Sequence, residues 1–334
     1  MTVDREKLIT ALEANRIAIS TIETPCYFFT GKAIESSNLD SFISVPFETD
    51  FVCNVLDKKL LAFVKGLNSE TITLTYDEKE FLLTVACGKI KSKFACSENA
   101  IPWPVIDEFK EMPIPPDTFA LACSRCIGYV SKDQTRIVLG GVHFVTVDGT
   151  LFAEATDGRR LCRISLGKID DKYDFIIPAS LLHLILREEI VEFSLTDTTI
   201  AFSCKSGTLY AGRIISGAYP NVNQVIPDST QEGYVEVVLP DTFKASLKRA
   251  LLLDDSRVDL DIKKDECEIS VTAKNVSYKE SVPVTASGET RVVFNTAYFA
   301  QAFEICPTLF MGSSSPCIGT SGNTTVIVMP LRAD

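Results

Sequence analysis

The chain has 334 residues, of which 46% are hydrophobic and 23% are charged, and its formal net charge is −11. A chain of this length is too long for one ordinary hydrophobic core, so two or three folded domains are expected. The negative charge argues against tight nucleic-acid binding by the surface as a whole, because such binding depends on neutralising phosphates. No apolar stretch is long enough to span a bilayer, and the charged, amphipathic residues 1–10 do not resemble a signal peptide.

The cysteines indicate a reducing compartment. There are eleven of them, an odd number, and they are widely spaced among mostly apolar neighbours. Such cysteines are typical of small core residues in the cytosol and not of a disulfide framework. We therefore expect a cytoplasmic protein.

The first third of the chain alternates between helical and strand periodicity. Apolar residues spaced as on one helix face predict helices over residues 4–14 and 56–66. Alternating apolar and polar residues then predict a hairpin of strands 71–75 and 81–85. The same order of elements returns twice further along the chain.

In the middle third, helices are predicted over residues 119–130 and 178–187, followed by a hairpin of strands 191–195 and 200–204. Asp157 and Gly158 separate two further runs of alternating apolar residues. That pattern predicts a hairpin with a two-residue turn, where positive φ costs Gly little and is tolerated by Asp. Taken alone, this segment is typical of a solvated hairpin tip.

The last third repeats the pattern, with helices predicted over residues 243–253 and 295–306 and a hairpin between them. The letters Pro-Asp-Thr-Phe at 116–119 recur at 240–243, each time just before a helix that Asp or Thr is expected to cap. The repeat predicts an α+β fold of three similar domains, each with two helices against antiparallel sheets. The expected domains are residues 1–110, 111–230 and 231–334.

No set of residues suggests catalysis. Cys123 and Cys126 form a lone C-x-x-C, and a zinc site would need a second pair or suitably placed histidines. The only histidines, His143 and His183, are expected to be packed or edge residues. Neither a nucleophile elbow nor a nucleotide-binding P-loop is present, and Asp157 is explained by its turn. We expect no enzyme activity, no metal and no cofactor.

Three separated segments carry a family resemblance: Ala-Thr-Asp-Gly-Arg-Arg-Leu at 155–161, Arg-Ile-Ile-Ser-Gly-Ala-Tyr-Pro-Asn at 213–221, and Val-Ile-Val-Met-Pro-Leu-Arg at 326–332. In this order they resemble the bacterial DNA polymerase III β subunit, the sliding clamp. Phe-Ile-Ile-Pro at 175–178 and Phe-Asn-x-x-Tyr at 294–298 are also similar to that family. The resemblance covers essentially the whole chain.

The resemblance implies a DNA-clamp fold that closes as a homodimeric ring around duplex DNA and tethers the replicative polymerase. It implies that polymerase and clamp-loader peptides bind a pocket between domains 2 and 3. A ring holds DNA topologically, so weak phosphate contacts inside it are compatible with the acidic net charge. Two alternatives remain: a clamp-like peptide-binding protein that does not encircle DNA, and a nucleic-acid-processing enzyme that uses Asp157.

The resemblance also assigns roles to particular residues. The peptide pocket would comprise an apolar floor, proline walls and a rim that includes Arg160 and Arg332; its residues are Leu139, Thr156, Gly158, Arg159, Arg160, Leu161, Pro220, Gln224, Val225, Val328, Met329, Pro330, Leu331 and Arg332. Of these, Arg159, Gln224 and Leu331 differ from the family. Without the resemblance, the same residues are explained as ordinary core residues at a domain contact.

Two further sets are predicted. The DNA-facing candidates are Lys89, Lys91, Lys93, Arg125, Lys132, Gln134, Lys205, Lys248 and Arg249, of which Lys132 and Gln134 match a family loop that touches DNA. Each cation among them is equally well explained as a solvated surface residue. The dimer seam would use Leu252 and Leu253, with Ile101 and Trp103 as their partners.

Overall fold

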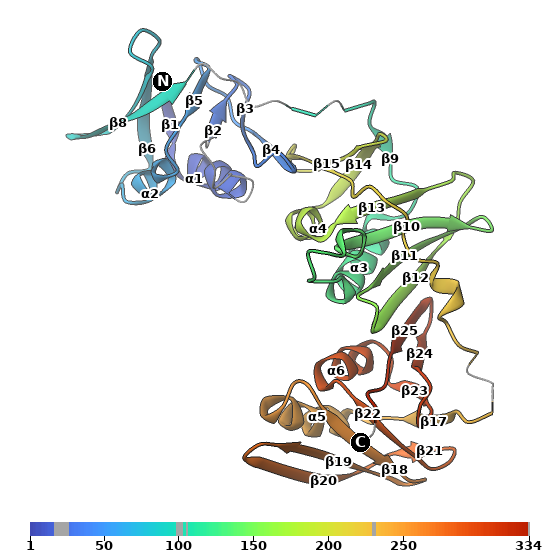
Figure 1. The fold of residues 1–334 in the computed structure, drawn as a ribbon. Helices are drawn as coiled ribbons and strands as arrows, with labels where there is room; N and C mark the ends of the chain where they lie inside the picture. The colour runs from blue at the N-terminus through green and yellow to red at the C-terminus, as the bar shows by residue number, and fades with distance from the viewer. Residues whose placement is uncertain (17–26, 98–102, 105, 229–231, 333–334) are drawn as a thin grey trace. The chain divides into compact units, whose positions relative to one another are not determined.

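The computed structural model describes residues 1–16, 27–97, 103–104, 106–228 and 232–332. The chain forms two compact units. The first contains Met1–Pro116 and Ser180–Ile215, and the second contains Asp117–Ala179 and Ser216–Asp334. Every sheet lies within one unit, and Figure 1 shows the course of the chain through them. The division into domains 1–110, 111–230 and 231–334 stays a prediction.

The first unit is built on a 12-stranded sheet in which every neighbouring pair is antiparallel. Its strands, in order across the sheet, are β1 (Thr2–Asp4), β6 (Thr71–Asp77), β7 (Leu82–Cys87), β8 (Ile90–Ser97), β5 (Cys53–Val55), β2 (Tyr27–Phe29), β3 (Ala33–Ser37), β4 (Ser41–Pro46), β16 (Leu209–Arg213), β15 (Thr199–Cys204), β14 (Ile190–Leu195) and β9 (Lys110–Glu111). Its helices are α1 (Arg5–Asn15), α2 (Lys59–Lys65) and, from Ser180 onward, α4 (Ala179–Ile185).

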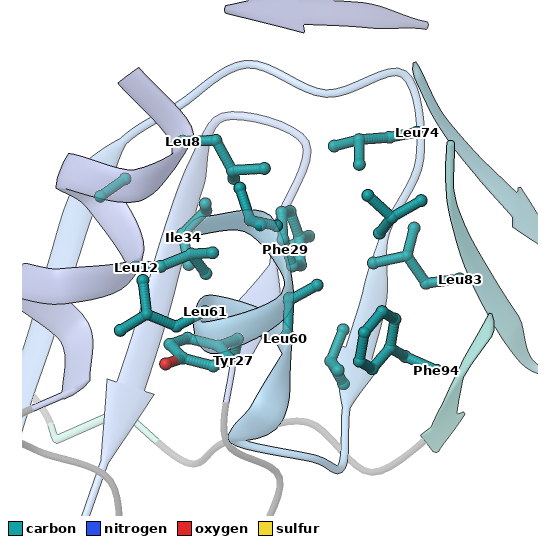
Figure 2. Packing of buried hydrophobic residues seen from close by; sticks show 14 of the residues in the cluster. Leu8, Leu12, Tyr27, Phe29, Ile34, Leu60, Leu61, Leu74, Leu83 and Phe94 are labelled. Atoms are coloured by element: carbon teal, nitrogen blue, oxygen red, sulfur yellow. The ribbon is translucent and has the colours of Figure 1, made fainter. Parts of the chain in front are cut away.

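The core of the first unit lies between α1, α2 and the sheet. Asp4 caps α1, because its side chain accepts a hydrogen bond from the backbone N of Lys7 at 2.9 Å. Leu8 and Leu12 follow one helical turn apart, so both point into the core. Figure 2 shows these leucines packed with strand residues and with α2; the labelled side chains are Leu8, Leu12, Tyr27, Phe29, Ile34, Leu60, Leu61, Leu74, Leu83 and Phe94.

The second unit contains a nine-stranded and a four-stranded antiparallel sheet. The nine strands, in order, are β13 (Asp174–Pro178), β10 (Gly141–Val147), β11 (Thr150–Thr156), β12 (Arg160–Lys168), β25 (Thr324–Val328), β24 (Cys317–Ser321), β23 (Thr308–Met311), β17 (Val235–Val238) and β21 (Thr285–Ala286). The four are β20 (Val276–Pro283), β19 (Glu266–Ala273), β18 (Val258–Ile262) and β22 (Thr290–Phe294).

The helices of the second unit are α3 (Pro116–Cys126), which enters it at Asp117, α5 (Asp241–Leu253) and α6 (Thr296–Ile305), with short 3-10 helices η2 (Ile127–Tyr129), η3 (Ile137–Leu139) and η4 (Val222–Gln224). α5 packs on α6 through Phe243, whose ring lies 5.6 Å from that of Phe303. Asn295 caps α6 by accepting a hydrogen bond from the backbone N of Tyr298 at 3.0 Å.

The six predicted helices and the predicted hairpins are all present, and the α+β class is confirmed. The expectation that Asp or Thr of the repeated Pro-Asp-Thr-Phe caps the following helix is wrong. α3 begins at Pro116 and α5 at Asp241, so these residues lie inside the first turn, and the residue at the N-cap of α5 is Pro240. Proline is suited to a helix start because it lacks an N–H that would go unpaired there.

The structure can be compared with two expectations drawn from the sequence, that the cysteines are unpaired core residues and that no stretch spans a membrane. Ten of the eleven cysteines are described, and all ten are free thiols, nine of them buried and Cys87 half-buried; Cys26 lies outside the described residues. Within the described part of the chain, no helix is long and apolar enough to cross a membrane.

Candidate functional site

The Asp157–Gly158 turn closes the hairpin of β11 and β12. Thr156 and Leu161 form the last cross-strand pair, which leaves residues 157–160 in the turn. The Asp157 carboxylate accepts two backbone N–H groups of the turn, at 2.9 and 3.1 Å, and Gly158 adopts a φ of +87°. The hairpin is confirmed, but the expected two-residue turn is wrong. Side-chain bonds of Thr156 and Asp157 to the backbone support a wider turn instead.

Residues of all three segments of the predicted pocket meet at this turn, and those that meet lie within the second unit, whereas residues 213–215 belong to the first. β25 pairs with β12, and beyond it the backbone N of Met329 donates to the carbonyl oxygen of Arg159 at 2.8 Å. From the segment after β16, the Tyr219 hydroxyl accepts a hydrogen bond from the backbone N of Thr156 at 3.0 Å. Leu161 lies in a buried cluster with Val222, Ile318 and Ile327. The structure brings the segments together, and their role in peptide binding stays a prediction.

The predicted pocket residues divide into buried and accessible ones. Leu139, Leu161 and Val328 are buried and match the alternative interpretation as core residues. Val225 and Met329 are 58% and 44% exposed, so they are the large apolar side chains that a ligand could reach. The others are exposed or half-buried: Thr156, Gly158, Arg159, Pro220, Gln224, Pro330, Leu331 and Arg332.

Arg160 does not form the expected basic rim. Its side chain is 9% exposed, and its Nε donates to the Asp157 carboxylate at 2.8 Å. Its guanidinium carbon lies 4.0 Å from the centre of the Tyr298 ring, and Nη1 donates to Gln301. Because Tyr298 and Gln301 belong to α6, Arg160 fastens the turn to that helix by a hydrogen bond and a cation–π contact.

A buried polar network lies behind the pocket, and sequence reasoning missed it. His143 lies between Glu154 and Asp174, with 2.9 Å from each ring nitrogen to a carboxylate oxygen, and its ring stacks on Tyr219 at 4.4 Å. Glu154 also lies 3.2 Å from Nε of Arg163, whose pKa is lowered by burial. A charged Glu and Arg inside the apolar runs of β11 and β12 were the signal available in the sequence.

The Arg163 end of this network reaches the pocket segment, because Arg163 donates to the side chain of Asn223 in η4. Its guanidinium carbon also lies 3.9 Å from the centre of the Phe152 ring. Tyr219 and Asn223 therefore hold the segment that carries Pro220, Gln224 and Val225 against the sheet. The prediction that His143 is a packed residue is confirmed, whereas His183 is exposed on α4.

The predicted DNA-facing cations differ in whether a carboxylate already pairs with them. Lys91 and Lys93 project from the exposed face of β8, whose other face buries Phe94. By contrast, Lys205 is paired with Glu189 at 2.9 Å. The free and exposed members, for which no ion pair occurs among the described residues, are Lys89, Lys91, Lys93, Lys132 and Lys248. Gln134 is also exposed.

Two predicted cations on helices already have partners. Arg125 of α3 donates to the Thr324 hydroxyl at 2.9 Å. Arg249 of α5 donates to both carboxylate oxygens of Glu280. Glu280 offsets the charge of Arg249, and the guanidinium of Arg125 is already hydrogen-bonded, so we rank these two below the free lysines.

The predicted seam residues have different surroundings. Leu252 is 85% exposed and Leu253 is 41% exposed at the end of α5. Trp103 is half-buried; its ring lies 5.8 Å from that of Phe42, and its Nε1 donates to Glu35. Ile101 lies outside the described residues.

The cysteine pair of α3 lies away from solvent. Cys123 and Cys126 are buried, and burial raises the pKa of both thiols. Among the residues that the structure describes, no group of three or more His, Cys, Asp or Glu side chains could hold a metal ion.

Comparison with known proteins agrees with the fold. A family model described as DNA polymerase III beta subunit, central domain, matches residues 113–221. The beta sliding clamp of Halalkalibacterium halodurans is 30% identical over 212 residues, which cover 60% of this chain and 55% of that protein. The beta sliding clamp of Treponema pallidum is 27% identical over 233 residues, covering 64% and 61%. These alignments thus span little more than half of each relative's length.

Solved structures match over the whole chain. The DNA polymerase sliding clamp of Bacillus subtilis superposes with a TM-score of 0.87 at 21% identity, covering 100% of this chain and 99% of that one. The DNA polymerase β subunit of Streptococcus pyogenes gives 0.86 at 17% identity, with 99% of both chains covered. The chain therefore has the DNA-clamp fold. The family model and the relatives that match this chain are those of the bacterial DNA polymerase III β subunit, the sliding clamps, which the sequence segments resemble.

Proposed function

We propose that this chain is a processivity factor that closes with a second copy into a ring around duplex DNA and tethers the replicative polymerase. The observation that carries this proposal is a clamp fold that extends over the full length of the chain. Sliding clamps are not enzymes, which agrees with the expectation that this chain performs no chemistry. The cytoplasmic location stays part of the proposal.

Topological binding resolves the conflict between DNA binding and the net charge of −11. A closed ring cannot dissociate sideways, so it does not need the many phosphate contacts that hold an open binder. The free lysines Lys91 and Lys93 would make weak, mobile contacts with phosphate, while acidic residues elsewhere keep the outer surface from binding DNA.

The experiment is retention on circular DNA. The chain is loaded by its clamp loader on a nicked circular plasmid, washed in moderate salt, and measured before and after the plasmid is cut once. We expect retention on the circle and release from the linear form. Equal retention on both would mean ordinary electrostatic binding, and no retention on either, with a species in solution near 36.7 kDa and not twice that mass, would favour a peptide-binding protein that never encircles DNA.

We further propose that partner peptides bind at the Asp157 turn. Val225 and Met329 would receive the apolar anchors, and the buried Leu161 and Val328 would form the layer beneath them. A short peptide that buries two apolar side chains at such a site is expected to bind with micromolar affinity, about −8 kcal/mol. Titration of peptides ending in leucine and phenylalanine, followed by fluorescence anisotropy, measures this directly.

A further inference from the structure

A row of ionisable side chains crosses the nine-stranded sheet beneath residues 219–225, which we call the covering segment. His143 of β10 lies opposite Glu154 of β11, and Glu154 lies opposite Arg163 of β12. Residues opposite each other in antiparallel strands project from the same face, and these three side chains are 7%, 4% and 10% exposed, respectively. Apolar residues would cover this face without the cost of removing charge from water, so packing alone does not explain the row.

The two polar contacts of His143 require two protons. Its Nδ1 lies 2.9 Å from a carboxylate oxygen of Glu154, and its Nε2 lies 2.9 Å from one of Asp174. A carboxylate can only accept a hydrogen bond, and a neutral imidazole has a single N–H to donate. Both contacts are therefore hydrogen bonds when the ring is an imidazolium, whereas a neutral ring turns one lone pair toward a carboxylate. Histidine ordinarily changes its charge between about pH 5 and 8, so this arrangement depends on pH.

The charges around His143 balance when its ring is protonated. β11 contributes Glu154, β13 contributes Asp174, and the covering segment contributes Tyr219, whose hydroxyl stays neutral because burial raises its pKa. β12 contributes Arg163, whose Nε lies 3.2 Å from the Glu154 carboxylate. Two cations then face two carboxylates, and loss of the ring proton leaves one carboxylate uncompensated. The Asp174 side chain is 82% exposed, so water can solvate it and its contact is the one that is lost.

The ring of His143 holds the start of the covering segment. It stacks on Tyr219 with 4.4 Å between the ring centres and 26° between the ring planes. A protonated imidazole over an aromatic face makes a cation–π contact, which a neutral ring cannot make. The Tyr219 hydroxyl in turn accepts a hydrogen bond from the backbone N of Thr156 at 3.0 Å. Protonation of His143 therefore strengthens the hold on Tyr219 and, through it, on the end of β11.

Two other contacts hold the rest of the covering segment, and neither needs the ring proton. Arg163 donates to the side chain of Asn223. Val222 lies in a buried apolar cluster with Leu161. Loss of the proton should therefore loosen the segment at Tyr219 without detaching it from the sheet.

We propose that His143 is a positioning residue that makes the hold on the covering segment depend on pH: the protonated ring fastens the segment, and the neutral ring loosens it. The segment carries Pro220, Gln224 and Val225 of the proposed peptide pocket. A loosened wall must be ordered again when a ligand binds, so partner peptides bind more tightly while the ring is protonated. This consequence for peptides rests on the proposed function, whereas the hold on the segment does not.

Hydrogen exchange measures the hold directly, because the backbone N–H of Thr156 bonds to the hydroxyl of Tyr219. The protection factor of this amide, corrected for the intrinsic exchange rate at each pH, is compared across about pH 5–8 in the intact chain. Peptide affinity is measured over the same range by fluorescence anisotropy. The probe is a peptide with leucine and phenylalanine anchors and capped ends that contains no Asp, Glu or His, so any pH dependence belongs to the protein.

Three variants assign the effect to particular residues. His143→Gln removes the titrating ring, and Asp174→Asn removes the exposed carboxylate that favours the imidazolium. His183→Gln is the matched control, because it removes the other histidine of the chain, which is exposed on α4. The side chains of Asp174 and His183 are exposed, so these two variants are expected to fold even if His143→Gln does not.

We expect the protection of Thr156 and the peptide affinity to fall about two- to fivefold as the pH rises through this range, in the intact chain and in His183→Gln alike. His143→Gln should show neither dependence, and Asp174→Asn should move the midpoint of both to a lower pH. A flat profile in the intact chain, or a midpoint that Asp174→Asn leaves unchanged, would overturn the proposal. Exchange that follows pH in this way while no peptide of a small panel binds at any pH would support the hold on the segment and refute the peptide pocket.

Discussion

The proposed ring seam can be tested by removing the two leucines at the end of α5. In the isolated chain Leu252 is 85% exposed and Leu253 is 41% exposed. Fully burying an exposed leucine stabilises by about 1.5–3 kcal/mol, so burial of these two fractions would contribute about 2–4 kcal/mol per seam. A ring of two copies closed head to tail has two identical seams, which doubles the contribution to about 4–8 kcal/mol.

The double variant Leu252→Ala, Leu253→Ala should therefore weaken dimerisation by about a thousandfold, using the lower end because alanine keeps one carbon. Sedimentation velocity over a range of concentrations measures this as a shift to the mass of one chain. The monomer should stay folded, with an unchanged circular dichroism spectrum, because neither leucine belongs to its buried core. The matched control is Leu121→Ala on α3, which removes a leucine that is 52% exposed outside the predicted seam. An unchanged dimer in the double variant would place the seam elsewhere.

Deleting residues 329–334 should abolish peptide binding in anisotropy titrations, because it removes Met329. The dimer should stay intact in sedimentation, because α5 is kept. Peptide binding equal to that of the intact chain would refute the pocket. The double variant Lys91→Glu, Lys93→Glu should reduce loading onto circular DNA. Lys205→Glu should change the loading little, because Lys205 is already paired with Glu189 at 2.9 Å. An equal loss of loading in both variants would contradict the ranking of free lysines above paired ones. Arg249 and then Tyr278 lower the pKa of Glu280 from 4.5 to about 2, so its stabilisation is present above pH 4.5 and is lost as the pH falls toward 2. Thermal melts of Glu280→Gln should accordingly show a weaker pH dependence in that window, and an unchanged dependence would contradict this.

Local patterns predicted the helices well. The helix expected over residues 4–14 is α1 at Arg5–Asn15, and the one expected over 295–306 is α6 at Thr296–Ile305. In both cases the expected first residue is the N-cap, whose side chain bonds to the helix backbone. Apolar spacing and capping are local properties, so a sequence displays them directly.

Such local patterns do not predict which strands pair with each other or which charged side chains are buried. The alternation within β12 predicts a strand, but only the fold determines that its neighbour is β25, whose residues lie more than 150 positions further along the chain. The pairing of Phe42 with Ala211, which joins β4 to β16, is equally remote. The resemblance implied that Arg160 lies at the rim of the pocket, and the structure instead buries its side chain between Asp157 and Tyr298.

The burial of Arg160 limits which charges of the turn a ligand could reach. Its contacts with Asp157 and α6 use up one cation and one carboxylate of the turn, so neither is available to a ligand. The turn still exposes the apolar side chain of Met329 and the charged side chain of Arg159. Arg160 therefore holds the turn in one conformation, because the turn cannot rearrange without losing the contacts of Arg160 with Asp157 and α6.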